Sequence, residues 1–334
     1  MRLGSQRVSA SPPYGGADRE ERTLLVSNVS ATPAPMGAAA EQDAPLYVVG
    51  DVHGHLEELK AALRARDLID ADAHWCGGRA RLWFLGDFTD RGPDGIGVVE
   101  LAMSLARESA EVGGSTRMLL GNHEILLLGV FRFGDHPVPV AGGSTTFREI
   151  WLRNGGMQSD LDRFTDEQAG WLAAQPVAAV VDGHLLIHSD SNAYLEYGDT
   201  IEEVDGTVAD ILREPEPLAW WDLFRNLTRR GAFMGEVGPY AAADLLSELG
   251  GRRIVHGHTP IPYQTGEDPS TIVEPRVYAD GQVVNLDGGI YLGGPCLVAR
   301  LPLSTARSGA LPSALEETQG RVYDLGDLGE EPQS

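Results

Sequence analysis

The segment Gly50-Asp51-Val52-His53-Gly54 directly follows the apolar run Leu46-Tyr47-Val48-Val49, and this junction decides the interpretation of the whole chain. Four apolar residues in succession predict a buried strand, and a glycine followed by a polar residue ends it. Leu56, Leu59 and Leu63 then recur at steps of three and four residues, which predicts an amphipathic helix. The junction therefore indicates a strand, a turn and a helix, with an aspartate and a histidine at the turn.

The same arrangement occurs twice more along the chain. A strand predicted at residues 81–85 precedes Gly86-Asp87-Phe88-Thr89-Asp90-Arg91-Gly92, and helical spacing follows at residues 98–105. A strand predicted at residues 118–120 precedes Gly121-Asn122-His123-Glu124. Strands that alternate with helices predict parallel βαβ units, in which sites gather at the carboxyl ends of the strands.

The second half of the chain has shorter strand patterns. Hairpins are predicted at residues 177–188 and 276–284, because Asp-Gly suits a two-residue turn between apolar runs. A last strand is predicted at residues 297–299. Residues 129–176 and 191–250 are mostly helical and polar, and we interpret them as insertions or a cap over the strand ends.

The two ends of the chain lack this patterning. Residues 1–44 are rich in Ala, Pro, Ser and Gly, which predicts a disordered leader, and residues 303–334 predict a flexible acidic tail. Residues 45–302 form the expected folded domain, in which residues 191–250 are a cap-like insertion.

The composition excludes several classes of protein. The 334 residues include 49 acidic and 26 basic side chains, a net charge of −23, which argues against nucleic-acid binding and against docking on anionic membranes. No apolar run approaches the ~20 residues that cross a bilayer. The two cysteines lie far apart, so no disulfide framework is indicated, and we expect a soluble cytoplasmic protein.

Metal-ligand side chains end each of five predicted strands. Besides the three segments above, His188 ends the run 186–188, and His256-Gly257-His258-Thr259-Pro260 ends another. Carboxylate oxygen and imidazole nitrogen together suit manganese, iron or zinc better than calcium. A single segment has little weight, but five such segments, each after an apolar run, indicate a metal site.

These segments together resemble the calcineurin-like metallophosphoesterase superfamily. Within it they are similar to the phosphoprotein phosphatase (PPP) family of serine/threonine phosphatases, whose marks are GDxHG, GDxxDRG and GNHE. The run 126–134 looks like the bacterial-type Shewanella-like branch, and Gly257-His258-Thr259-Pro260 looks like bacterial and phage members. The resemblance covers about 46–300 and is weak in 190–250. It implies an α/β protein, a four-layer α/β/β/α sandwich with a helical cap.

The resemblance also implies two divalent metal ions, manganese first and iron or zinc as alternatives. The ligands of the first ion would be Asp51, His53 and Asp87. The ligands of the second ion would be Asp87, Asn122, His188 and His258. A hydroxide that bridges both ions would attack phosphorus in line, so no phosphoenzyme forms.

Three further residues receive roles from the same resemblance. His123 would protonate the leaving group, and Asp90 would orient and charge its imidazole. Arg91 would bind the phosphate together with Asn122 and a second arginine from the cap. Arg230 is the expected second arginine, and the adjacent Arg229 stays an alternative.

The implied function is hydrolysis of phosphomonoesters, foremost phosphoserine, phosphothreonine or phosphotyrosine in proteins. The alternative is hydrolysis of diadenosine polyphosphates, because the cap offers basic and aromatic side chains that could bind bases and extra phosphates: Trp220, Trp221, Arg225, Arg229 and Arg230. A metal-bound binding module without activity is the remaining alternative, although none of the expected ligands is missing. The roles of Asp190 and His256 stay open: Asp190 is either a partner of a metal ligand or a surface acid, and His256 is a ligand, a partner of a ligand or a packed residue.

Overall fold

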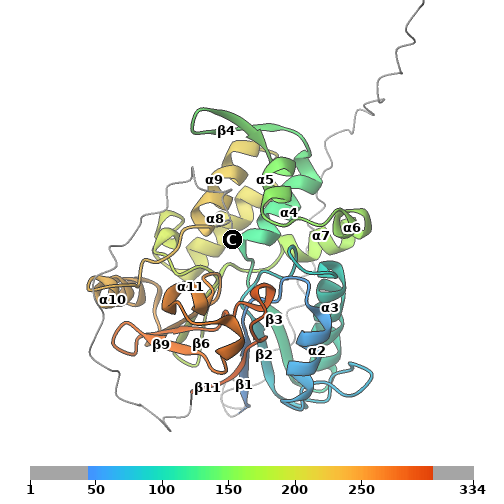
Figure 1. Ribbon diagram of the computed structural model, residues 1–334, viewed down its shortest axis with the longest axis vertical. Helices are drawn as coiled ribbons and strands as arrows, with labels where there is room; N and C mark the ends of the chain where they lie inside the picture. The colour runs from blue at the N-terminus through green and yellow to red at the C-terminus, as the bar shows by residue number, and fades with distance from the viewer. Residues whose placement is uncertain (1–43, 304–334) are drawn as a thin grey trace, which may run out of the picture.

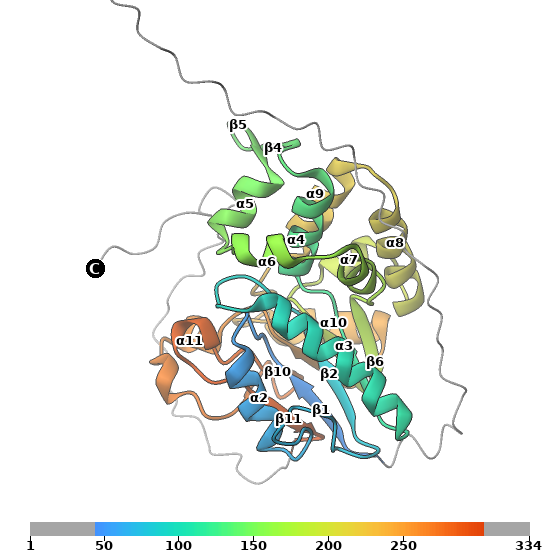
Figure 2. The same ribbon diagram turned by 90° about the vertical axis from the view of Figure 1, so that its right-hand side faces the viewer.

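The protein is described by a computed structural model that covers residues 44–303 (Figure 1). The expected leader and the expected acidic tail therefore lie almost wholly outside the described residues. Two sheets lie at the centre of the described part, and helices cover them on both outer faces and at one end (Figures 1 and 2).

The first sheet has the strand order β11-β1-β2-β3, and β1, β2 and β3 run parallel as predicted. Its strands are β1 (Leu46–Val49), β2 (Arg81–Phe84), β3 (Ser115–Met118) and the antiparallel β11 (Val298–Leu301). The third strand was predicted at residues 118–120, and this was wrong: β3 begins three residues earlier and ends two residues earlier. As an edge strand, β3 carries the exposed Arg117, so its sequence is less apolar than the segment that follows it.

The second sheet has the order β6-β7-β8-β10-β9, and it contains both predicted hairpins. Its strands are β6 (Ala178–Val181), β7 (His184–Ile187), β8 (Arg253–His256), β9 (Arg276–Tyr278) and β10 (Val283–Asn285). Asp182 and Gly183 both have positive φ at the first hairpin turn, which is the conformation that a type I′ turn requires.

Alternate residues of the strands face opposite layers, as the two-residue period of a strand requires. Val48, Leu186 and Val255 belong to an apolar cluster between the two sheets, whereas Val49 and Leu185 belong to a larger cluster formed with the helices. The central strands of both sheets are therefore buried on both faces. The expected four-layer α/β/β/α architecture is confirmed.

Helices α2 (Leu56–Arg64) and α3 (Gly95–Glu111) cover the outer face of the first sheet, and α10 (Gly238–Leu249) packs against β8 of the second (Figure 2). A further group of helices gathers beyond the carboxyl ends of the parallel strands (Figure 1). This group comprises α4 (Asn122–Phe133), α5 (Phe147–Arg153), α6 (Gln158–Arg163), α7 (Asp166–Ala173), α8 (Ile201–Arg213) and α9 (Pro217–Leu227). Residues 191–250 are thus divided between this group and the outer face of the second sheet.

The remaining elements are short. They are the hairpin β4 (Pro137–Val140) and β5 (Gly143–Thr146), the helix α11 (Ile261–Thr265) and the 3₁₀ turns η1 (Ala193–Glu196), η2 (Pro269–Thr271) and η3 (Ile290–Leu292). None of the helices within residues 44–303 has the length and apolar character needed to cross a membrane.

Asp160 of α6 lies at the first turn of α3 and is 1% exposed. Its Oδ1 accepts a hydrogen bond from the N–H of Ile96 at 3.3 Å. Burial, together with the nearby charges of Asp90 and Asp94, raises the pKa of Asp160 from 3.8 to about 6. The folded protein therefore favours the protonated form, and this contribution to stability is complete below pH 4 and lost as the pH rises through about 6.

We expect Asp160→Asn to increase the free energy of unfolding by about 1–2 kcal/mol at pH 7.5 and to change it little at pH 4, because the amide is neutral at both. Urea unfolding at the two pH values measures the difference. Asp162→Asn, an exposed position on the same helix, is the matched control. An equal change at both pH values would contradict the assignment.

Candidate active site

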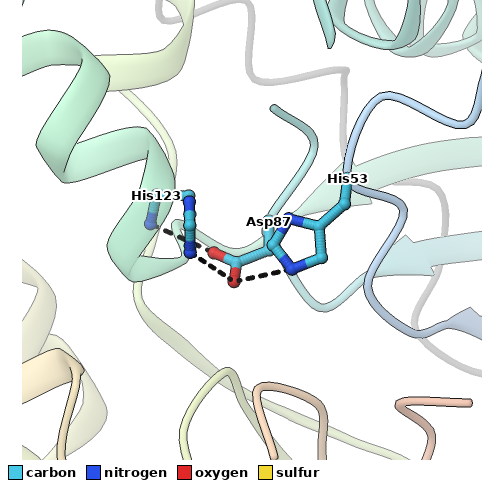
Figure 3. Close-up of side chains that lie close together, drawn as sticks. All are labelled: His53, Asp87 and His123. Carbon is cyan, nitrogen blue, oxygen red and sulfur yellow. Dashed lines mark hydrogen bonds and ion pairs between the residues drawn. The ribbon is translucent and has the colours of Figure 1, made fainter. Parts of the chain in front are cut away.

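Asp87 lies at the centre of the site, just after β2, and is 1% exposed. Its Oδ2 is 3.7 Å from Nε2 of His53 and 3.9 Å from Nε2 of His123. Figure 3 shows the carboxylate between the two imidazoles, which come from the turn after β1 and from the start of α4. The segments after the first three strands therefore meet at one carboxylate, as the parallel topology predicts.

The other oxygen of Asp87 faces a second group of ligands. Oδ1 is 3.3 Å from Nε2 of His188, and the same nitrogen is 2.9 Å from Oδ1 of Asn122. His258 joins this group, and its ring lies 5.0 Å from that of His188. Two sets of metal-ligand atoms result, and within each set all atoms lie within 4.8 Å of one another. The first set comes from His53, Asp87 and His123, and the second from Asp87, His188 and His258.

Three histidines of the site have one ring nitrogen bound to a backbone carbonyl. Nδ1 of His53 donates to Thr89 at 3.0 Å, and Nδ1 of His188 donates to Leu85 at 2.9 Å. Nε2 of His258 donates to the carbonyl of Thr228 at 3.0 Å. A carbonyl only accepts, so each ring carries a proton on that nitrogen, and in the neutral ring the other nitrogen has a lone pair that can bind a metal.

Asp51, the expected third ligand of the first ion, is 2% exposed, and its Oδ2 is 4.0 Å from Nε2 of His53. Both of its oxygens accept from the backbone N–H of His258 at 3.0 Å. A side chain at Gly257 would place its Cβ 2.0 Å from Oδ1 of Asp51, which explains the glycine there. The third ligand atom of the first set comes from His123, and Asp51 lies beside that set without belonging to it.

Buried charge at the site fits a cation. Burial and the neighbouring Asp287 raise the pKa of Asp51 well above its usual range. Burial also acts to raise the pKa of Asp87, but His188, His123 and His53 lower it well below its usual range. Asp287 is itself buried, and within residues 44–303 its Oδ2 has no hydrogen-bond partner. Carboxylates enclosed in this way are stabilised by a metal ion.

Backbone strain is concentrated at the same positions. Ten non-glycine residues among those described have positive φ, and five of them are expected site residues. These five are His53 at 45°, Asp87 at 55°, Arg91 at 67°, His258 at 67° and Asp90 at 69°. Such conformations cost energy and persist only where surrounding contacts enforce them, which is typical of functional sites.

His123 is held by a chain of two short hydrogen bonds. Its Nδ1 donates to Oδ2 of Asp90 at 2.6 Å, and Oδ1 of Asp90 accepts from Nε1 of Trp151 at 2.7 Å. All three side chains are at most 1% exposed. Asp90 therefore lies where it can orient the imidazole, and Trp151, which sequence reasoning did not select, binds its other oxygen. No motif marks Trp151, because it lies on α5, 28 residues beyond His123.

Arg91 lies at the edge of the site and is half-buried. Its Nη1 is 2.9 Å from Nε2 of His53, and its guanidinium lies 4.2 Å from the ring centroid of Tyr291. The ring of Tyr291 also meets that of His53 edge-on at 5.1 Å. Sequence reasoning did not select Tyr291, whose contact with the guanidinium is a cation–π interaction.

Two polar residues near the ligands have structural contacts. Glu124 accepts hydrogen bonds from the backbone N–H groups of Asp87, Phe88 and Gly121, at 2.8, 2.7 and 2.9 Å. His256 uses both nitrogens, one with its neighbour's carbonyl at 2.7 Å and one with a tyrosine hydroxyl at 2.7 Å. Neither belongs to the two ligand sets, so His256 is a packing residue and Glu124 ties two loops together.

Arg229 and Arg230 differ in their surroundings although both are exposed. Arg229 forms an ion pair with Glu196. Burial, and then the charge of Arg230, lowers the pKa of His258 well below its usual range, so the charge of Arg230 acts on a candidate ligand. This distinction supports Arg230 as the expected phosphate-binding residue.

We expect Arg230→Ala to raise KM for an aryl phosphate about tenfold, because a charge-assisted contact to the phosphate is lost. Arg229→Ala is the matched control and should change KM by less than about twofold, since an exposed ion pair contributes little. Initial rates across a range of substrate concentrations give both constants. The reverse order of effects would move the assignment to Arg229.

Paired sets of buried carboxylate and imidazole ligands at the strand ends of a two-sheet sandwich define a metal-binding hydrolase of the phosphoesterase class. Comparison with known families gives the same result. Residues 44–262 match the family described as calcineurin-like phosphoesterase, and the chain belongs to that family. The resemblance predicted from the sequence is confirmed.

Relatives in sequence fall into two groups. Shewanella-like protein phosphatase 2 of Arabidopsis thaliana is 35% identical over 94 residues, which cover 28% of this chain and 24% of that protein. A symmetrical bis(5'-nucleosyl)-tetraphosphatase of Pectobacterium carotovorum is 35% identical over 145 residues, 42% of this chain and 41% of the relative. One from Ralstonia nicotianae is 30% identical over 176 residues, 51% of this chain and 50% of the relative. The chain thus matches between a quarter and a half of the length of these relatives.

Solved structures confirm the fold. The cold-active protein-tyrosine phosphatase of a psychrophilic Shewanella superposes with a TM-score of 0.58 and 19% identity, covering 76% of this chain and 74% of the other. At this identity the similarity concerns the fold alone.

Proposed function

We propose that the chain is a two-metal phosphatase that hydrolyses phosphomonoesters, foremost phosphoserine, phosphothreonine or phosphotyrosine in proteins. The observation that carries this proposal is the buried chain of His123, Asp90 and Trp151 beside the two ligand sets. A proton donor next to a metal pair suits the transfer of a phosphoryl group from an alcohol to water.

The ligands proposed for the first ion are Asp51, His53 and Asp87; those for the second are Asp87, Asn122, His188 and His258. Mixed oxygen and nitrogen ligands favour manganese, with iron or zinc as alternatives. When bound, two such ions polarise the phosphoryl oxygens and lower the pKa of water. The protein contributes the fixed tautomers of the histidines and the shared carboxylate.

The proton and the phosphate are assigned to separate residues. His123 gives its Nε2 proton to the departing alkoxide, while Asp90 accepts from Nδ1 and stabilises the charged imidazole. Arg91, Asn122 and Arg230 bind the phosphate oxygens, and the planar guanidinium groups suit two oxygens each. Tyr291 fixes the plane of the Arg91 guanidinium.

The surroundings of four cap residues favour phosphomonoesters over dinucleotides. Trp220 and Trp221 are at most 3% exposed, and their indole N–H groups donate to backbone carbonyls at 3.0 Å. Arg225 pairs with Asp222, and Arg229 pairs with an acid on another turn. The two indoles are therefore not available to stack on bases, and each of the two arginines already has an acidic partner.

The second candidate is hydrolysis of diadenosine polyphosphates. It is favoured by the matched segments of the bis(5'-nucleosyl)-tetraphosphatases, which share 30–36% identity with this chain in four bacteria. Those segments cover about half of each relative or less, so their whole activity does not transfer directly to this chain.

Purified protein supplied with Mn²⁺, with its metal content measured, distinguishes these functions. It should be assayed on phosphopeptides, diadenosine tetraphosphate and p-nitrophenyl phosphate in parallel. We expect kcat/KM for at least one phosphopeptide to exceed that for diadenosine tetraphosphate at least about tenfold. The opposite order would establish the dinucleotide hydrolase instead. Full metal occupancy without hydrolysis of any of the three substrates would identify a binding module.

A further inference from the structure

Asp190 lies two residues beyond His188, and its side chain is fully buried. Its Oδ1 accepts from the hydroxyl of Thr259 at 2.6 Å, and its Oδ2 accepts from the backbone N–H of Gly231 at 3.0 Å. The amide nitrogen of Gln264 lies 3.5 Å from the same Oδ2. The carboxylate is therefore neither a metal ligand nor a surface acid, and it joins three separate segments.

Residues 228–232, here called the Arg230 segment, are fixed to the two ligand segments at three backbone atoms. The carbonyl of Thr228 accepts from Nε2 of His258 at 3.0 Å. The N–H of Gly231 donates to the Asp190 carboxylate, and the N–H of Ala232 donates to the Asp190 carbonyl at 3.0 Å. Arg230 lies between these attachments, although its own side chain is exposed.

We propose that Asp190 is a positioning residue that holds the Arg230 segment against the metal-ligand segments, so that Arg230 faces the phosphate. The inference rests on the proposed function only in assigning phosphate binding to Arg230. The carboxylate suits the task because two of its neighbours are donors, a hydroxyl and a backbone N–H, and each is bound by a different oxygen.

The partner of Asp190 in the Arg230 segment is a backbone N–H, that of Gly231, and the conformation of this glycine is unusual. Gly231 has φ of +80°, and a Cβ at this position would meet no atom within 4 Å. Glycine is therefore required here by the conformation rather than by space. The turn presents its N–H to Asp190, and a buried, charge-assisted hydrogen bond of this kind contributes more than a neutral one.

A series of three variants tests the proposal. Asp190→Ala removes both contacts and leaves two donors unpaired. Asp190→Asn can keep both, because its oxygen accepts from Gly231 while its amide donates to the hydroxyl of Thr259. Thr259→Val removes only the contact that does not reach the Arg230 segment. We therefore expect the three changes to differ in the binding of phosphate.

With p-nitrophenyl phosphate, Asp190→Ala should raise KM and the inhibition constant of inorganic phosphate about tenfold, with a smaller change in kcat. Asp190→Asn should stay within about threefold of the parent protein in both constants. In an Arg230→Ala background, Asp190→Ala should have almost no further effect, because the group that it positions is absent. Metal content per chain should be the same in every variant.

Hydrogen exchange provides a readout that does not depend on activity. The amides of Gly231 and Ala232 should exchange at least about tenfold faster in Asp190→Ala than in the parent protein, and Thr259→Val should leave them nearly unchanged. If the protein hydrolyses no phosphate ester, the proposed function fails while this exchange test still stands. Unchanged exchange, loss of metal in Asp190→Ala, or independent effects of Asp190→Ala and Arg230→Ala would each overturn the positioning role.

Discussion

Asp87→Asn is expected to reduce kcat/KM for p-nitrophenyl phosphate at least about a thousandfold, a loss of about 4 kcal/mol of transition-state stabilisation. One carboxylate faces both ligand sets, with Oδ2 toward His53 and Oδ1 toward His188. The amide keeps the size and the acceptor for the N–H of His123 at 3.1 Å, but it loses the shared negative charge. Both metal sites should therefore weaken together.

Metal analysis and steady-state rates measure this result on the same protein sample. Bound metal should fall from about two ions per chain to less than one, as a shared ligand of a two-ion site requires. Asp222→Asn, at an exposed position on α9, is the matched control for the change in charge and chemistry. Two ions retained at full occupancy with near-normal turnover would contradict the bridging role of Asp87.

His123→Asn is expected to lower kcat about a hundredfold to ten-thousandfold for an alkyl phosphate such as a phosphoserine peptide. The loss should be much smaller for p-nitrophenyl phosphate, because nitrophenolate departs without a proton. The proton comes from Nε2 of His123, because Nδ1 is bound to Asp90 by a hydrogen bond of 2.6 Å. Comparing kcat for the two substrates measures the dependence on the leaving group.

The same variant decides between two roles of this imidazole. Nε2 of His123 is 3.9 Å from Asp87 and lies within a ligand set, so it could also bind the first ion. A proton donor can be replaced without loss of metal, whereas a ligand cannot. Equal losses on both substrates, together with loss of one ion, would make His123 a ligand and leave the proton donor unassigned.

Short-range patterns were sufficient to predict most of the fold. The strand at residues 46–49 and the turns at Asp182 and Asp280 were predicted because apolar runs and Asp-Gly turns are local signals. The third strand was displaced from its prediction, since edge pairing with β2 rather than apolar character sets its limits. The interpretation of residues 191–250 as one cap-like insertion stays a prediction, and within that range α10 packs against β8.

Some residues of the site could be selected from the sequence, and others could not. Asp51, His53 and Asp87 were selected because each follows a strand within a short motif, and parallel strands bring such turns to one edge. Trp151 and Tyr291 were missed because no motif surrounds them. They reach the site through α5 and the turn η3, which pack there from distant parts of the chain.

The sequence by itself determined the family and which residues at the strand ends are candidate ligands. It could not separate neighbouring residues of one chemical type, such as Arg229 and Arg230, or assign Asp190 and His256. Only the tertiary structure shows that their surroundings differ, because successive side chains point in different directions and their partners come from segments remote in sequence. Arg229 meets Glu196, while Asp190 meets Gly231 and Thr259. Spacing determines which residues share a strand end, and packing determines which of them face the site.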